Sequence, residues 1–149
     1  MILAIDPGVQ QTGLAIVEYD KSMLYPLVVD AKTVVATDAD QIANMVRKYK
    51  PTSIVIEKPF VARNWNMFGL VSYMIGLVVG HLVSIQDAYM VNIVFVSART
   101  HTYILVGAKT RKQKEVKGKE LWGDIIDSDH AACAAAIGVW YANKNREEV

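Results

Sequence analysis

Acidic residues stand at three points of the sequence where an apolar segment ends or a helix is expected to begin. Asp6 directly follows the apolar run 2–5, and Glu57 directly follows the β-branched run 52–56. The third point carries two acids in front of an alanine-rich segment, Asp127 and Asp129. An ionised carboxylate is costly inside an apolar strand, so its position at a strand end is informative. If the two apolar runs are neighbouring strands, these carboxylates converge at one edge of a sheet.

Such a convergence suits metal-dependent hydrolysis of a phosphodiester. Carboxylate oxygens on separate elements hold Mg²⁺ and leave coordination positions for water and a substrate phosphate. Two ions about 3.5–4 Å apart can activate the water and stabilise the leaving oxygen. Taken singly, each acid has a plainer interpretation, because Asp6 with Pro7-Gly8 could form a turn, Glu57 could be a surface charge, and Asp127 or Asp129 could cap a helix. The hypothesis depends on all three points carrying an acid.

Hydrophobic spacing predicts the elements that position these acids. Apolar or alternating runs predict strands over residues 1–5, 12–19, 24–35, 52–56 and 91–96. Helical spacing predicts helices over residues 38–50, 66–86 and 100–106, and a last helix that starts at Asp127 or Asp129 and extends through Trp140. Asp38 is the expected N-cap of the first helix. We therefore expect an α/β fold with a mixed sheet flanked by helices.

Length and composition narrow the class of protein. The 149 residues suffice for one domain with a hydrophobic core. The formal net charge is +1, so bulk charge gives no evidence for a nucleic-acid partner. The single cysteine, Cys133, excludes a disulfide framework and favours a reduced, cytoplasmic compartment. The apolar stretch 67–85 contains His81 and Ser84, so we interpret it as a helix between the sheet and a partner subunit, not as a membrane span.

Positive charge is concentrated in one segment. Residues 109–119 contain a single acid, Glu115, and six basic residues: Lys109, Arg111, Lys112, Lys114, Lys117 and Lys119. A lysine-rich loop in solvent is the plainer interpretation. Beside a carboxylate cluster, such a patch would supply contacts to nucleic-acid phosphates.

These motifs together resemble the RuvC family of Holliday junction resolvases, over nearly the whole chain and in the family's order. Residues 2–8 (ILAIDPG) followed by Thr12-Gly13 resemble its opening hairpin, and residues 57–64 (EKPFVARN) resemble its second motif. Residues 96–99 (VSAR) with Val106-Gly107 resemble its fifth strand and the turn beyond the next helix, and residues 129–132 (DHAA) resemble its final acidic motif.

The resemblance implies one RNase H-like domain over residues 1–149, with a five-stranded mixed β-sheet flanked by α-helices. It implies an endodeoxyribonuclease that resolves Holliday junctions or related branched DNA, as a homodimer making paired nicks. It implies two Mg²⁺ ions per site, which Mn²⁺ would replace, and catalytic metal ligands at Asp6, Glu57, Asp127 and Asp129. Expected DNA contacts come from Phe60, Arg63, Asn64, Arg99, Lys109, Arg111, Lys112 and Lys114.

The final motif departs from the family pattern, which often has two acids, or His and Asp, three residues apart. Asp129 directly precedes the small-residue helix, but the residue three places earlier is Ile126. Asp127 takes the missing role, or Asp124 and Asp127 form the three-spaced pair. His130 is a further candidate for acting on the scissile phosphate, although a histidine at a helix start is commonly a surface residue.

Three other functions remain open at this point. An RNase H-like nuclease could act on RNA, as YqgF-like relatives do, or on DNA that is not a junction. An actin-like ATPase also opens with an Asp-Gly hairpin, but it needs a longer chain and glycine-rich phosphate loops. A binding module without activity requires the acids to be incidental. For the homodimer, residues 66–86 are the candidate interface, where Gly76 and Gly80 permit close approach.

Overall fold

The computed structural model describes residues 1–20, 22–36, 38–59, 69–73, 75–77, 79–80 and 91–147. Its centre is a five-stranded sheet with the strand order β3-β2-β1-β4-β5. The strands are β1 (Ile2–Asp6), β2 (Gln11–Glu18), β3 (Leu27–Val35), β4 (Ser53–Glu57) and β5 (Asn92–Val96). β1 pairs antiparallel with β2 and parallel with β4, so the sheet is mixed as predicted. The strands that end in Asp6 and Glu57 are therefore direct neighbours.

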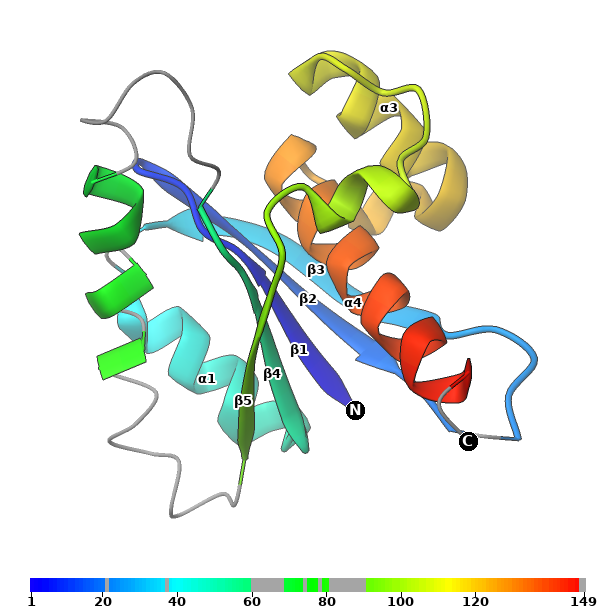
Figure 1. Cartoon of the computed structure of the whole chain (residues 1–149), viewed down its shortest axis with the longest axis horizontal. Coiled ribbons are helices and arrows are strands. Elements are labelled where there is room, and N and C mark those ends of the chain that lie inside the picture. The colour runs from blue at the N-terminus through cyan, green and yellow to red at the C-terminus, as the bar shows by residue number, and fades with distance from the viewer. Residues whose placement is uncertain are drawn as a thin grey trace.

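Helices cover both faces of the sheet (Figure 1). The elements are α1 (Ala39–Tyr49), α3 (Arg111–Trp122) and α4 (Asp129–Glu147), with the 3₁₀ helices η1 (Thr100–Tyr103) and η2 (Gly123–Ile125). Residues 69–73, 75–77 and 79–80 are also helical, and the rest of the helix predicted over 66–86 lies outside the described residues. One face carries α1 and the described helical residues 69–73, 75–77 and 79–80, whereas the other carries α3 and α4. No helix within the described ranges is long and apolar enough to span a membrane.

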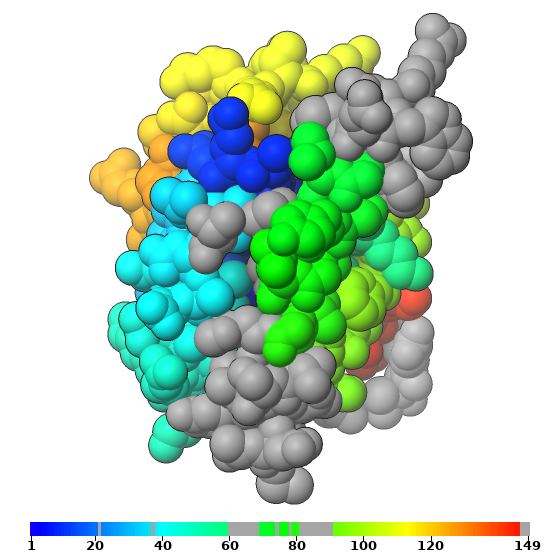
Figure 2. All heavy atoms as spheres, turned by 90° about the vertical axis from the view of Figure 1, so that its left-hand side faces the viewer, coloured from blue at the N-terminus to red at the C-terminus, as the bar shows by residue number. Residues whose placement is uncertain are grey.

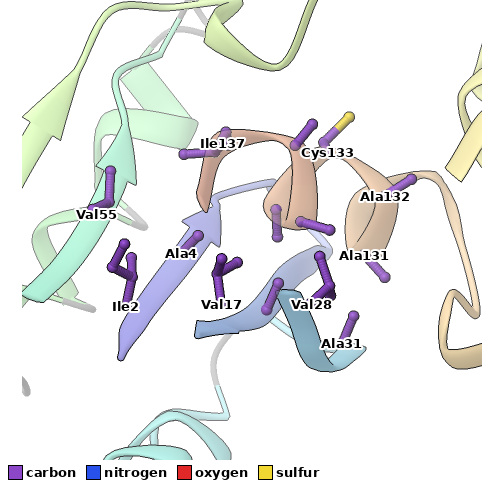
Figure 3. Close-up of a cluster of buried hydrophobic side chains, with 14 of the residues drawn as sticks. Ile2, Ala4, Val17, Val28, Ala31, Val55, Ala131, Ala132, Cys133 and Ile137 are labelled. Carbon is purple, nitrogen blue, oxygen red and sulfur yellow. The ribbon is translucent and has the colours of Figure 1, made fainter. Parts of the chain in front are cut away.

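Alternation along the strands divides the core into two layers. Leu3 and Ile5 pack on the α1 side with Ile54 and Ile56, whereas the intervening Ala4 packs on the α4 side. The α4 layer is built from small side chains, including the buried residues Ala131, Ala132, Cys133, Ala134, Ala135 and Ala136 (Figure 3). Small side chains let α4 approach the sheet closely, and this approach brings its first turn to the strand ends.

Most predicted elements are present, and two differ. Asp38 caps α1 as expected, because its side chain accepts a hydrogen bond from the backbone N–H of Gln41 at 3.2 Å. The lysine-rich segment is a helix, α3, rather than a loop, and Thr110 and Gln113 form a capping box at its start. The helix expected over residues 100–106 is the shorter η1, and α4 begins at Asp129 and continues past Trp140 to Glu147.

Candidate active site

The strand registers place one row of residues across the α4-facing side of the sheet. Thr33 of β3 is opposite Gly13 of β2, and Gly13 is opposite Asp6 of β1. Ile5 pairs with Ile56 in parallel, so the next residues along, Asp6 and Glu57, lie side by side, and Glu57 pairs with Val96 of β5. Residues at the same level of adjacent parallel strands have their side chains on the same face. The two carboxylates therefore converge as the sequence predicted.

Asp6 is held by a histidine from the first turn of α4. His130 Nδ1 lies 2.9 Å from Asp6 Oδ2, and both side chains are largely buried. The contact is possible because residue 13 is glycine. A Cβ atom at Gly13 would lie 2.0 Å from the carbonyl oxygen of His130, closer than a Cβ atom can approach. The glycine on β2 thus sets the distance between α4 and the sheet.

The surroundings of Asp6 make its ionised form costly. Burial, reinforced by repulsion from the Glu57 carboxylate, raises the pKa of Asp6, and the hydrogen bond and the charge of His130 oppose that rise. The hydrogen bond to Asp6 is the main cause that raises the pKa of His130, and burial opposes it. A cation at this point would satisfy both carboxylates, because it would offset the burial and their repulsion together.

Glu57 is held by a second histidine, from η1. His101 Nδ1 lies 3.1 Å from each Glu57 oxygen, and the backbone N–H of His101 donates to Oε1 at 3.2 Å. Glu57 and His101 are both buried, with 6% and 8% of their surfaces exposed. The other ring nitrogen, Nε2, is 3.1 Å from Nζ of Lys114 on α3. Each strand-end carboxylate is therefore paired with an imidazole from the helical layer.

Asp127 has another partner. Its Oδ2 accepts the backbone N–H of Thr33 at 2.9 Å, and its Oδ1 accepts the Thr33 hydroxyl at 2.8 Å. The Thr33 hydroxyl also contacts the Ser128 hydroxyl, and Ser128 caps α4 by accepting the backbone N–H of Ala131 at 3.2 Å. Asp127 and Ser128 thus tether the start of α4 to the edge strand β3.

Asp129 is the first residue of α4 and forms an ion pair with Arg111 of α3, with 3.9 Å between Oδ2 and Nε. The sequence predicts that Asp129 points toward the strand ends, but the structure places His130 there. Consecutive residues of a helix are separated by about 100°, so the start residue decides which side chain faces the sheet. Because α4 starts at Asp129, His130 occupies the position against Asp6.

The basic residues of α3 divide between two faces of the helix. Lys114 and Arg111 face the site through His101 and Asp129. The others form ion pairs along the helix: Lys112 and Lys119 with Glu115, and Lys117 with Glu120. A pocket of about 490 Å³ opens beside Glu57, and its basic lining residues are Arg99, Lys109 and Lys114. A second pocket, of about 430 Å³, is lined by residues that include His130 and Arg111.

The donor set fits a hard divalent cation. Among the described residues no group of three or more His, Cys, Asp or Glu side chains is arranged around one point as metal ligands are. Asp6 and Glu57 nevertheless supply buried carboxylate oxygens from adjacent strands, which is the oxygen chemistry that Mg²⁺ prefers. Asp129 and His130 stand next to them at the start of α4, where a further ligand would have to come from.

Three predicted DNA contacts, Phe60, Arg63 and Asn64, lie outside the described residues. Sequence reasoning does not identify two of the side chains at the site. It favours Asp129 over His130, although the position of His130 directly before the alanine run is a usable signal. It gives no signal for His101, because nothing in the local sequence indicates a contact with a residue 44 positions away.

The chain is similar to known Holliday junction resolvases. The family described as crossover junction endodeoxyribonuclease RuvC matches residues 2–139. Thermus thermophilus RuvC in complex with a Holliday junction substrate has a TM-score of 0.72 at 16% identity, over 98% of this chain and 95% of that one. The yeast mitochondrial Holliday junction resolvase has a TM-score of 0.65 at 12% identity, over 99% and 81%.

A fowlpox virus resolvase, in a complex with substrate Holliday junction DNA, has a TM-score of 0.59 at 15% identity, over 97% of this chain and 99% of that one. No curated protein sequence matches the chain. The structural similarities confirm the predicted RNase H-like fold. Because the family match extends over nearly the whole sequence, the chain belongs to the RuvC family of crossover junction endodeoxyribonucleases.

Proposed function

We propose that this protein is a structure-selective endodeoxyribonuclease that resolves Holliday junctions or related branched DNA by divalent-metal-dependent phosphodiester hydrolysis. One observation carries the proposal: two carboxylates, the buried Glu57 and the largely shielded Asp6, lie side by side at the ends of adjacent parallel strands. Burial raises the pKa of Asp6, and the neighbouring Glu57 carboxylate adds to that rise. A cation bound between the two carboxylates would relieve their repulsion, which favours a metal-binding role.

Asp6 and Glu57 would hold the metal, with Asp129 and His130 at the start of α4 as further ligands. A pair of Mg²⁺ ions, which Mn²⁺ would replace, would supply an activated water and stabilise the leaving oxygen. Asp127 enters this set only if its side chain leaves Thr33, because both of its oxygens accept hydrogen bonds there. If His130 does not bind the metal, its Nε2 would accept or donate a proton at the scissile phosphate, with Nδ1 held by Asp6.

The pocket beside Glu57 supports binding of a phosphodiester backbone. Arg99, Lys109 and Lys114 line it, so positive charge borders the carboxylates where a DNA phosphate must approach. Arg111 and Lys112 extend this charge along the exposed side of α3. The similar resolvases of Thermus thermophilus and fowlpox virus were solved with Holliday junctions, which favours branched DNA as the substrate. Phe60, Arg63 and Asn64 remain proposed contacts of the same DNA.

We also propose a homodimer through the helical residues 69–80. Three large apolar side chains, Leu70, Tyr73 and Leu77, are 48%, 64% and 45% exposed, and their spacing places them on one side of the helix. Gly76 has open space where a side chain would stand. In Figure 2 the described part of this helical segment, coloured green, lies at the surface beside α1, coloured cyan. Two related copies would present two sites to the two symmetric strands of a four-way junction.

The nuclease proposal is tested with the variants Asp6→Asn and Glu57→Gln. Each removes a charge that would hold metal and leaves the basic residues intact, so junction cleavage in Mg²⁺ should be lost while junction binding persists. Asp40→Asn, which removes an exposed carboxylate from the first turn of α1, is the matched control and should cleave like the wild type. Near-wild-type turnover by either site variant would refute the proposed site.

The substrate is tested with a panel of four-way, three-way and linear DNA and an RNA–DNA hybrid. Preferential cleavage of the four-way junction supports the proposal, whereas cleavage of the hybrid alone would favour the RNA-directed function. For the dimer, light scattering of Leu77→Glu should show a monomer where the wild type is dimeric. A cruciform plasmid should then be nicked on one strand instead of linearised, and a monomeric wild type that still makes paired nicks would exclude this interface.

A further inference from the structure

His101 holds Glu57 with two donors on one residue. Its backbone N–H donates to Oε1 at 3.2 Å, and its ring Nδ1 lies 3.1 Å from both Oε1 and Oε2. Oε1 therefore contacts both the backbone N–H and the ring of His101, whereas Oε2 contacts only the ring, which it shares with Oε1. The backbone N–H is available because it lies in the first turn of η1, where the N–H groups have no partner within the helix.

Lys114 decides which ring nitrogen of His101 carries the proton. Its ammonium group has only donors, and Nζ lies 3.1 Å from Nε2. Nε2 must therefore accept, so the proton of the neutral ring is on Nδ1 and is donated to Glu57. The three side chains form an ordered series in which Lys114 donates to His101 and His101 donates to the carboxylate. This series runs from the basic helix α3 to the end of β4.

Such support matters at a metal site because a ligating carboxylate binds well only in a fixed orientation. Residues that hydrogen-bond the ligands orient them, and their loss typically weakens metal affinity about 10–100-fold. Glu57 has three rotatable side-chain bonds, and it is the ring of His101 that both of its oxygens contact. Burial of both residues keeps water from replacing these hydrogen bonds.

We infer that His101 is a positioning residue for Glu57: its ring and its backbone N–H hold the carboxylate in one orientation, in which Oε2 accepts fewer hydrogen bonds than Oε1 and can bind the divalent ion, and Lys114 fixes the ring. The inference rests on the proposed metal-dependent function. In this role His101 acts through Glu57 and contacts neither the DNA nor the metal. It also predicts that α3 and Glu57 are coupled, because Lys114 contributes both to the phosphate pocket and to the orientation of the carboxylate.

Replacement of His101 by the two amides tests this role. The side-chain nitrogen of Asn occupies about the position of Nδ1, and that of Gln occupies about the position of Nε2. His101→Asn should therefore keep the donor to Glu57, whereas His101→Gln and His101→Ala should lose it. The readout is Mn²⁺ affinity of the DNA-free protein, measured by the electron paramagnetic resonance of free Mn²⁺, beside the melting temperature without metal and single-turnover junction cleavage.

We expect Mn²⁺ affinity within about threefold of the wild type for His101→Asn, and a loss of about 10–100-fold for His101→Gln and His101→Ala. If His101→Ala does not fold, the comparison of Asn with Gln carries the test. A lower melting temperature with unchanged Mn²⁺ affinity in His101→Gln would overturn the inference, and so would equal losses in the Asn and Gln variants. A wild type that cleaves no junction in Mg²⁺ would instead refute the proposed function.

Discussion

The substitution Gly13→Ala tests whether the close approach of α4 to the sheet builds the site. A Cβ atom at residue 13 would lie 2.0 Å from the carbonyl oxygen of His130 and 2.4 Å from its carbonyl carbon. Because real Cβ contacts are essentially never shorter than 3.0 Å, the first turn of α4 must retreat by about 1 Å. The obstacle is backbone on both sides, so no side-chain rotation can relieve it.

A retreat of this size acts on the contact between His130 and Asp6. Their 2.9 Å separation would increase beyond hydrogen-bonding distance. A misplacement of about 1 Å in an active site can lower the rate about 10²-fold. Crowding of a packed interface also costs about 1–3 kcal/mol of stability, and each kcal/mol lowers the melting temperature of a chain this size by about 2–4 °C.

The assay is single-turnover cleavage of a four-way junction at saturating enzyme, together with thermal unfolding. Gly138→Ala is the matched control, because a Cβ atom there would lie 2.5 Å from Val17 Cγ2, in the same interface between α4 and the sheet. It lies eight residues along the helix from His130, about 12 Å away. Gly138→Ala should lower the melting temperature and keep the rate. The reasoning is refuted if the cleavage rate of Gly13→Ala is within threefold of the wild-type rate. It is also refuted if the cleavage rates of both variants fall by the same factor.

Three further outcomes are expected. Asp127→Asn keeps an acceptor for the Thr33 amide and should leave rate and stability nearly unchanged, whereas Asp127→Ala should lose about 0.5–1.5 kcal/mol. A rate loss of orders of magnitude in Asp127→Asn alone would identify a metal ligand. The hydrogen bond to Asp6 raises the pKa of His130 above 6.5, so its stabilisation is complete below pH 6.5 and is lost as the pH rises through the raised value. The metal-free melting temperature should therefore fall from pH 6 to pH 9 in the wild type and less in His130→Asn, and equal slopes would contradict this. Burial raises the pKa of the Cys133 thiol, so its alkylation at pH 8 should be slow in the native protein and fast in guanidinium, and a fast native reaction would show that the thiol is accessible.

The part of the site on the strands could be predicted from sequence because strand ends are locally encoded. The apolar runs stop at Asp6 and Glu57, and the structure ends β1 and β4 at these residues. A charged residue that follows a buried strand lies at the edge of the sheet where that strand ends. Two such residues on neighbouring parallel strands therefore lie side by side. The same local reasoning found Asp38 as the cap of α1.

The helix α3 was not predicted because it packs without an apolar stripe. Its one buried residue is Gly118, and a Cβ atom there would lie 2.6 Å from that of Ala132 on α4. The contact is a close approach of two backbones, so hydrophobic periodicity carries no signal. The capping box of Thr110 and Gln113 was a readable signal, since Thr followed three residues later by Gln is typical of a helix start.

The partners of the carboxylates could not be predicted, because they are set by packing between distant segments. His101 is 44 residues from Glu57, and His130 is 124 residues from Asp6. The choice between Asp129 and His130 depends on a single residue of helix register, which Ser128 fixes as the cap. No spacing within the last motif distinguishes the two, since both are polar and both precede the alanines.

Because each carboxylate and its histidine come from different elements, the fold can carry the two acids before any metal binds. The carboxylates come from the strands, and both imidazoles come from the helical layer, so each acid gains a partner only when α4 and η1 dock on the sheet. Repulsion between Asp6 and Glu57 is then offset by two separate contacts from different elements. Gly13, which sets the distance between α4 and the sheet, therefore controls the site without contributing a side chain to it.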